Sequence, residues 1–410
     1  MELGEIKKAF VGLDGIDTTA ALLADNGARV HWSGLVGSSK AFCASSVCEQ
    51  IPSHHVFVLN DKEEAAYFFN DLQSVNPGQE KSILFFPDTH KTPYQVEDTE
   101  NAHVVQRAEI LEAIRQKSNV WLVTYPQALT DLVPTQKKLV KNTMKIEVGK
   151  EYSIPFLNDL LLEYQFERVD FVYEPGQYAI RGGIVDVYSF SNDHPFRIEF
   201  FGDEVDSIRV FDPVDQLSKA DHHHFQIVPN IHHASFTKEG LGSILEFMGE
   251  TTRMWVNDVE LIRLVLDKQI QKAQEVFDQM NSELERTAPN QLFFSSEEFT
   301  KQIEDRGIIE FGQANGFKSS KKIKFDFVPQ PSFNKQFELL REDLMMRVKK
   351  GYSCAIFSNQ PKQIERLEQI FEDIGGGVEF SPVPYALHEG FVSPSLEIAC
   401  FTDHQIFERY

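Results

Sequence analysis

The residues most suited to binding a phosphate group lie in the segment GLVGSSKA, residues 34–41. A phosphate-binding loop has the pattern G-x-x-x-x-G-K-[ST], in which backbone N–H groups and a lysine hold the phosphates and a hydroxyl binds Mg²⁺. Ser39 and Ala41 stand where this pattern needs its second glycine and its hydroxyl. A methyl group cannot bind magnesium, and a Cβ at the tight turn crowds the phosphate. We therefore predict a vestigial, non-functional phosphate loop made of Gly34, Gly37, Ser39, Lys40 and Ala41.

Other candidates for chemistry are weaker. The histidines of the run 222–224, with His232 and His233, could bind a metal, but adjacent histidines in a strand point to opposite faces. We expect a solvated connection there. Asp88 follows an apolar run but is followed by Thr89, so no Asp-Glu pair completes a magnesium site. No Ser/His/Asp or Cys/His spacing stands out, and the sequence predicts no catalytic residue and no metal site.

A possible protein-binding face lies in the segment 174–213, EPGQYAIRGGIVDVYSFSNDHPFRIEFFGDEVDSIRVFDP. Side chains alternate along a strand, so in FRIEFF the residues Arg197 and Phe201 share the face opposite the apolar one. In QYAIR, Arg181 falls on the polar side. If these strands pair, Arg181, Arg197 and Phe201 form an exposed patch of the residue types enriched in protein–protein hot spots. The alternative is an ordinary solvated sheet face.

The elements that would position these residues follow from the periodicity. Residues 1–145 alternate short apolar runs with helical patterns, which favours buried parallel strands at 28–32, 55–60, 82–87 and 119–125 and helices at 40–50, 62–72, 103–116 and 126–132. From residue 144 to about 230 the pattern changes to a helix followed by alternating strands, with Gly202 and Asp203 as a two-residue hairpin turn. A long helix should begin after an N-cap at Asn257, and the last 85 or so residues predict another α/β unit.

Composition limits the class of protein. A chain of 410 residues suggests two to four domains, at roughly 100–200 residues each. Its 62 acidic and 40 basic residues give a net charge of −22, which disfavours nucleic-acid binding without a local basic patch. The four cysteines are scattered, and no signal core or long apolar run is present. We expect a cytoplasmic protein that neither spans nor binds a membrane, and a monomer.

The segment 174–213 also carries a resemblance. EPGQYAIRGGIVDVYSF followed by FRIEFFGDEVDSIRVFDP is similar to the N-terminal module of the bacterial transcription-repair coupling factors, the Mfd family, and to the related UvrB family. FFPDTHKTPYQ and the closing EGFVSPSLEIACFTDHQIF extend the resemblance over essentially the whole chain. It implies an α/β fold with four domains: a degenerate P-loop, helicase-like parallel-sheet domain 1a (1–143), an inserted antiparallel α+β domain 2 (144–230), a domain 1b packing back on 1a (231–325), and a C-terminal α/β domain 3 (326–410).

Two departures favour Mfd over UvrB. UvrB has an intact phosphate loop and an aromatic hairpin that probes DNA, whereas this sequence has Ser39 and Ala41 in its loop and no Tyr-rich run after PYQVEDTENAH. In the Mfd family this region has lost ATP hydrolysis and DNA probing, and the ATP- and Mg²⁺-dependent translocase motor lies in a C-terminal part. That part would also contact RNA polymerase and double-stranded DNA. The resemblance implies no cofactor and no enzymatic activity for residues 1–410.

The resemblance implies UvrA as the partner of this module. The family residues that contact UvrA match Arg181, Arg197 and Phe201, and the resting full-length protein is expected to mask this surface with its C-terminal end. The module would link removal of stalled RNA polymerase to nucleotide excision repair. Two alternatives stay open: a UvrB-type ATP-dependent damage-verification subunit, and a structural arm, which leaves the Arg–Phe face unexplained.

Overall fold

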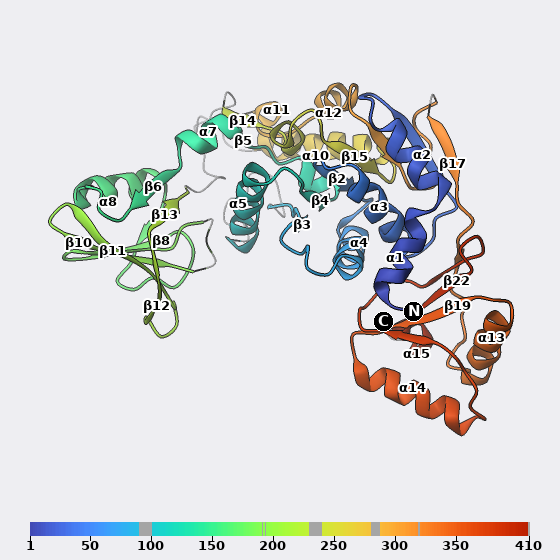
Figure 1. The fold of residues 1–410 in the computed structure, drawn as a ribbon. Coiled ribbons are helices and arrows are strands. Elements are labelled where there is room, and N and C mark those ends of the chain that lie inside the picture. The colour runs from blue at the N-terminus through green and yellow to red at the C-terminus, as the bar shows by residue number, and fades with distance from the viewer. Residues whose placement is uncertain are drawn as a thin grey trace.

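The chain folds around one large parallel sheet, with an antiparallel sheet and a second, smaller α/β unit beside it (Figure 1). The computed structural model describes residues 1–89, 101–190, 192, 194–228, 240–279, 288–318 and 320–408. This arrangement confirms the predicted α/β class, with a helicase-like parallel sheet and a separate antiparallel sheet.

The large sheet has seven parallel strands in the order β17-β1-β16-β15-β2-β4-β3. The central strands are buried along their whole length, as expected when helices cover both faces of a parallel sheet. The strands are β1 (Arg29–Ser33), β2 (His55–Val58), β3 (Ile83–Phe85), β4 (Trp121–Thr124), β15 (Arg253–Val256), β16 (Ile308–Glu310) and β17 (Lys321–Lys324).

Helices pack on both faces of this sheet (Figure 1). They are α1 (Leu3–Val11), α2 (Asp14–Leu22), α3 (Ser39–Gln50), α4 (Lys62–Val75), α5 (Asn101–Gln116), α6 (Pro126–Leu129), α9 (Ile244–Met248), α10 (Val259–Gln279), α11 (Pro289–Leu292) and α12 (Ser296–Ile303). A two-stranded ladder of β5 (Val133–Pro134) and β14 (Leu241–Gly242), with α7 (Gln136–Lys141), connects the sheet to the antiparallel unit.

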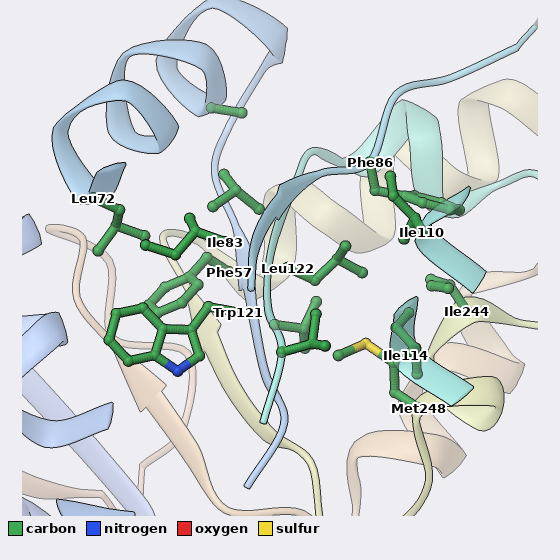
Figure 2. Close-up of a cluster of buried hydrophobic side chains, with 14 of the residues drawn as sticks. Phe57, Leu72, Ile83, Phe86, Ile110, Ile114, Trp121, Leu122, Ile244 and Met248 are labelled. Carbon is green, nitrogen blue, oxygen red and sulfur yellow. The ribbon is translucent and has the colours of Figure 1, made fainter. Parts of the chain in front are cut away.

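The core of the parallel-sheet unit shows the alternation that its buried strands require. Trp121 and Leu122 are consecutive in β4, and Figure 2 shows their side chains on opposite sides of the strand. Trp121 lies with Leu72 and Ile83, whereas Leu122 points toward Met248. Both residues are at most 2% exposed, so each face of the sheet has its own apolar layer.

The antiparallel unit carries a six-stranded sheet in the order β12-β11-β10-β9-β8-β7. Its strands are β7 (Glu167–Arg168), β8 (Gln177–Arg181), β9 (Ile184–Val187), β10 (Phe196–Phe201), β11 (Glu204–Phe211) and β12 (Ser218–His222); β7 alone of these pairs in parallel, with β8. Leu157 and Leu161 of α8 (Ile154–Glu163) are buried in the same core as the inward side chains of β8 to β11. β6 (Met144–Glu147) and β13 (His224–Ile227) form a separate antiparallel pair.

The last α/β unit contains a five-stranded sheet in the order β18-β21-β22-β19-β20. Its elements are β18 (Val328–Pro329), α13 (Phe337–Lys349), β19 (Ser353–Phe357), α14 (Pro361–Asp373), β20 (Ser381–Val383), β21 (Phe391–Ser393), β22 (Ile398–Thr402) and α15 (Asp403–Phe407). Phe391 of β21 packs edge-on against Phe10 of α1 and Phe42 of α3, with ring centroids 5.9 and 5.6 Å away. The two α/β units therefore share an apolar core.

One predicted helix start is wrong. We expected Asn257 as the N-cap of the long helix, but the backbone N–H groups of Glu260 and Leu261 donate to the Asp258 carboxylate at 3.0 and 3.1 Å. The Asn257 amide instead donates to Glu64 at 2.7 Å, because Asn257 directly follows the carboxyl end of the central strand β15. The expected end of this helix, at about residue 286, lies outside the described residues, and the four domain boundaries stay a prediction.

A buried histidine makes the fold sensitive to acid. His55 of β2 is fully buried, accepts a hydrogen bond from the Trp255 indole at 3.1 Å and contacts the Ile51 carbonyl at 3.0 Å. Burial lowers the pKa of His55 from 6.5 to about 4. A depressed folded-state pKa contributes stability that is present above pH 6.5 and lost as the pH falls toward 4.

We expect this loss to reach about 3 kcal/mol. The measurement is the free energy of unfolding in urea from pH 7 to pH 4, for the unaltered chain and for His55→Gln. The variant is less stable at neutral pH. Its unfolding should take up one proton fewer than that of the unaltered chain, so its free energy of unfolding should fall less steeply between pH 6.5 and pH 4. Equal slopes for both proteins would show that His55 does not titrate on unfolding.

Candidate functional site

Strand register brings the predicted UvrA-contacting residues to one face of the antiparallel sheet. Arg197 of β10 lies directly opposite Asp186 of β9, and Asp186 lies opposite Ala179 of β8, two residues before Arg181. Opposite residues in paired strands point to the same face. The carboxylate of Asp186 is therefore placed between the two guanidinium groups.

Asp186 holds both arginines. Its side chain is fully buried and accepts hydrogen bonds from Arg197 Nε at 2.8 Å and Arg197 Nη2 at 2.9 Å. The same carboxylate pairs with Arg181 Nη2, and Arg181 Nη1 donates to the Asp170 carbonyl at 3.0 Å. A bidentate pair around a buried carboxylate is the strong, directional form of this interaction. It fixes the guanidinium planes relative to the sheet.

The two arginines differ in exposure. The Arg181 side chain is 37% exposed, but that of Arg197 is only 16% exposed. Arg197 also stacks over the buried Phe211 ring at 4.6 Å and donates from Nη1 to the Gln216 carbonyl at 3.2 Å. Alternation predicted that Arg197 is exposed to solvent, and the structure corrects this: the side chain is mostly covered, and all three guanidinium nitrogens donate to Asp186 or to the Gln216 carbonyl.

Phe201 is the most exposed of the three residues. The residue is 83% exposed, at the last position of β10 and next to the hairpin turn. The predicted two-residue turn is present, with Gly202 at φ +66°, and a register shift between Glu199 and Phe200 precedes it. The left-handed φ suits glycine, because it has no Cβ. The turn and the bulge together present an aromatic ring to solvent at the end of the sheet.

Sequence reasoning missed one ring of this face. Arg181 lies over the ring of Phe171 at 5.3 Å, and Phe171 is itself 52% exposed. A guanidinium over an aromatic face is attracted by the ring quadrupole. Phe171 lies in an irregular loop, where no period of two or 3.6 residues could predict its direction. The Arg–aromatic face, defined here as Phe171, Arg181, Arg197 and Phe201, is thus larger than the sequence indicated.

The second candidate is the degenerate phosphate loop, in which three backbone N–H groups donate to carbonyls of the same loop. The N–H groups of Ser39, Lys40 and Ala41 donate to carbonyls of residues 36–38, at 3.2, 3.4 and 3.0 Å. The Ser39 hydroxyl accepts a hydrogen bond from the Val36 N–H at 3.0 Å and donates to the Val36 carbonyl at 2.6 Å. Ala41 is fully buried. Amide groups that are already paired are not available to cradle a phosphate.

Glycine is required at the start of the loop because the loop packs closely against Phe325, the residue that follows β17. Gly34 has φ +78°, and a Cβ on it would lie 2.0 Å from the carbonyl oxygen of Phe325. The glycine that the phosphate-loop pattern shares thus has a structural role here, which does not depend on a nucleotide.

Carboxylates surround the loop lysine. Lys40 Nζ lies 3.6 Å from the Glu64 carboxylate, which also accepts the hydrogen bond from Asn257. A cavity of about 330 Å³ adjoins Lys40. The acidic residues that line it are Asp61, Glu63, Glu64, Asp71 and Glu389. One amine among five carboxyl groups is an unfavourable environment for a triphosphate.

The remaining candidates add no chemistry. His222 ends β12 and His224 begins β13, while His232 and His233 lie outside the described residues. Among the residues that the structure describes, no group of three or more His, Cys, Asp or Glu side chains could hold a metal ion. Over the same residues, no helix has the length and apolar character needed to cross a bilayer.

Comparison with known proteins gives this arrangement a family context. Residues 144–233, which include the Arg–aromatic face, match the UvrB interaction domain. The transcription-repair-coupling factor of Borreliella burgdorferi is 23% identical over 83% of the chain, and that of Bacillus subtilis is 28% identical over 45% of it. UvrABC system protein B of Streptococcus uberis is 24% identical over 53% of the chain.

The matches cover 33% of the Borreliella protein, 16% of the Bacillus protein and 34% of the Streptococcus protein, so the chain spans about a third or less of each relative. The parallel and antiparallel sheets, the matched interaction domain and these relatives together identify the chain as related to the UvrB-like N-terminal region of the transcription-repair coupling factors.

Proposed function

We propose that the chain is a UvrA-recruiting adaptor, which links the removal of stalled RNA polymerase to nucleotide excision repair. The observation that carries the proposal is Phe201: a phenyl ring that is 83% exposed inside a domain matched to the UvrB interaction domain. Exposed aromatic residues next to arginine are typical anchors of protein–protein interfaces. Contacts of the full-length protein with RNA polymerase and DNA belong to this proposal too, as do the four domains and their boundaries.

The contacts on the Arg–aromatic face support a division of roles. Phe201 would fill an apolar pocket on UvrA. Arg181 keeps N–H groups beyond those bonded to Asp186 and Asp170, and it would pair with a UvrA carboxylate. Arg197 is a positioning residue in this scheme, because its nitrogens are used within the sheet.

Direct binding tests the proposal. Purified UvrA should bind the 410-residue chain in isothermal titration calorimetry, with an affinity in the range of specific protein complexes, about 1 µM or tighter. Absence of binding to UvrA that is active with a UvrB protein in the same assay would remove the proposed function.

The adaptor role needs no nucleotide. The paired lysine and the acidic surroundings of the phosphate loop support this part of the proposal. We expect no ATP turnover above background, with or without DNA, and no thermal shift with Mg-ATP, since Lys40 is paired with Glu64 and acidic side chains surround it. Lys40→Ala should behave like the unaltered chain in both assays. Turnover that Lys40→Ala abolishes would favour the alternative, a UvrB-type damage-verification ATPase.

A further inference from the structure

A segment of the last α/β unit occupies the mouth of the degenerate phosphate loop. The N–H of Ser38 donates to the carbonyl of Glu389 at 3.0 Å, and the N–H of Glu389 donates back to the Ser38 hydroxyl at 3.1 Å. A Cβ on Gly37 would lie 2.8 Å from Glu389 Cβ and 2.9 Å from its carbonyl oxygen, so the two backbones are in close contact. The start of α3 is thus bonded to a protein carbonyl.

The neighbouring residue is held by a buried carboxyl group. The N–H of His388 donates to Asp71 Oδ1 at 2.7 Å, and Asp71, on α4, is 5% exposed. The His388 ring stacks on Tyr67, with centroids 3.6 Å apart and planes 9° from parallel. Two parts of the parallel-sheet unit, the loop before α3 and helix α4, therefore hold the pair His388–Glu389.

The segment is also fixed within its own unit. The N–H of Gly390 donates to Gln405 of α15 at 2.8 Å, and Leu387 and Phe391 on either side are buried in the apolar core that the two α/β units share. The contact is consequently a docking point for the whole unit, because residues 388–390 cannot leave the loop without straining these anchors.

The geometry points to a proton-linked latch: the degenerate phosphate loop has become the docking site for residues 388–390, and protonation of Asp71 strengthens the attachment of the last α/β unit to the parallel-sheet unit. The ligand of the former nucleotide site is, in this inference, a peptide segment of the same chain. The latch does not depend on UvrA binding, which involves the antiparallel sheet.

The charges around Asp71 give the sign of the effect. Burial raises the pKa of Asp71 from 3.8 to about 7, with a further increase from Glu389, against the hydrogen bonds from Ser38 and His388. A raised pKa contributes stability that is present at low pH and is lost as the pH rises through 7. Raising the pH from 6.5 to 8 should therefore weaken the latch by about fourfold.

The other titratable groups at the contact act at lower pH. Burial lowers the pKa of His388 and of His404, whose rings stack with centroids 6.0 Å apart. Both are largely neutral above pH 6.5, so Asp71 dominates the range from 6.5 to 8. Among the described residues, the remaining charged groups around the contact are Asp61 before α4, Glu63 and Glu64 on α4, Lys40 on α3, Glu389 in the segment and Asp403 on α15.

Hydrogen exchange tests the latch in the intact chain. Protection of the Ser38, His388 and Glu389 amides, corrected for the intrinsic rate, should fall together by about fourfold between pH 6.5 and 8. Asp71→Asn keeps an oxygen acceptor for His388 but cannot ionise, so its protection should be independent of pH in this range. Asp25→Asn, at an exposed aspartate outside the contact, should behave like the unaltered chain.

A second variant probes the contact itself. Ser38→Ala removes the hydroxyl that accepts from Glu389, and it should speed exchange at Glu389 and His388 at every pH. The inference is overturned if Asp71→Asn retains the pH dependence of the unaltered chain, or if the three amides exchange independently of one another. Either result is readable whether or not the chain binds UvrA.

Discussion

Phe201→Ala is expected to weaken binding of the chain to UvrA by about 30- to 1,000-fold, a loss of about 2–4 kcal/mol. Phe201 is 83% exposed at the end of β10, so its ring contributes little to folding stability. Its apolar surface can be removed from water by a bound partner, and this burial would contribute to the binding free energy. The free energy of unfolding should change by no more than about 0.5 kcal/mol. Calorimetric titration of UvrA and urea unfolding measure the two quantities separately.

Phe156→Ala is the matched control. Phe156 is 48% exposed on α8 of the same domain, but it is not part of the Arg–aromatic face. Its removal should leave UvrA affinity unchanged. If Phe201→Ala binds as well as the unaltered chain, or if both variants lose affinity equally, Phe201 is not the anchor.

Asp186→Ala is expected to cost about 3 kcal/mol of folding stability and to abolish most of the UvrA affinity. The carboxylate is fully buried and bonded by both Arg181 and Arg197, so its loss leaves two guanidinium groups without their common partner. Breaking a buried ion pair costs about 3–5 kcal/mol. We expect the lower end of this range, because the partly exposed Arg181 side chain can turn toward water. Affinity falls because nothing then holds Arg181 in place on the face that also carries Phe201. Urea unfolding and UvrA titration, at a temperature where the variant stays folded, measure both effects.

Two further variants separate positioning from general damage. Glu199→Ala removes a half-exposed carboxylate paired with Arg209 on the same face, and a surface pair of this kind contributes less than about 1 kcal/mol. Asp186→Asn keeps the shape and one acceptor oxygen, and it should recover part of the stability and affinity. Full UvrA affinity in folded Asp186→Ala would show that the carboxylate does not position the arginines.

The strands of the parallel sheet within the first 145 residues could be predicted closely, because their signals are local, whereas β15 and β16 of the same sheet were not predicted. The strand expected at 55–60 is observed at His55–Val58, and the helix expected at 62–72 runs from Lys62 to Val75. The two N-terminal helices were not predicted, although Leu3, Ile6 and Phe10 have helical spacing and are all buried. Single capping positions were less predictable, as Asp258 shows, because two adjacent polar residues compete for the same role.

The Arg–aromatic face could be predicted in part. Alternation along β8 and β10 correctly put Arg181 and Phe201 on the exposed side, because a strand has a period of two. It could not predict how far Arg197 is covered, since that depends on Asp186 in another strand and on Phe211 below it. Phe171 was missed because a loop has no period.

The sequence by itself determined the α/β pattern, the two-residue turn at Gly202 and the chemical defects of the phosphate loop, Ser39 and Ala41. These depend on the type and order of neighbouring residues, which the chain specifies directly. Only the tertiary structure decided that Asp186 holds two arginines, that Glu64 pairs with Lys40, and that residues 388–390 fill the loop mouth. The last of these contacts joins Ser38 and Glu389, which are 351 positions apart in the sequence. Such pairings arise from strand order and core packing, which local periodicity does not encode.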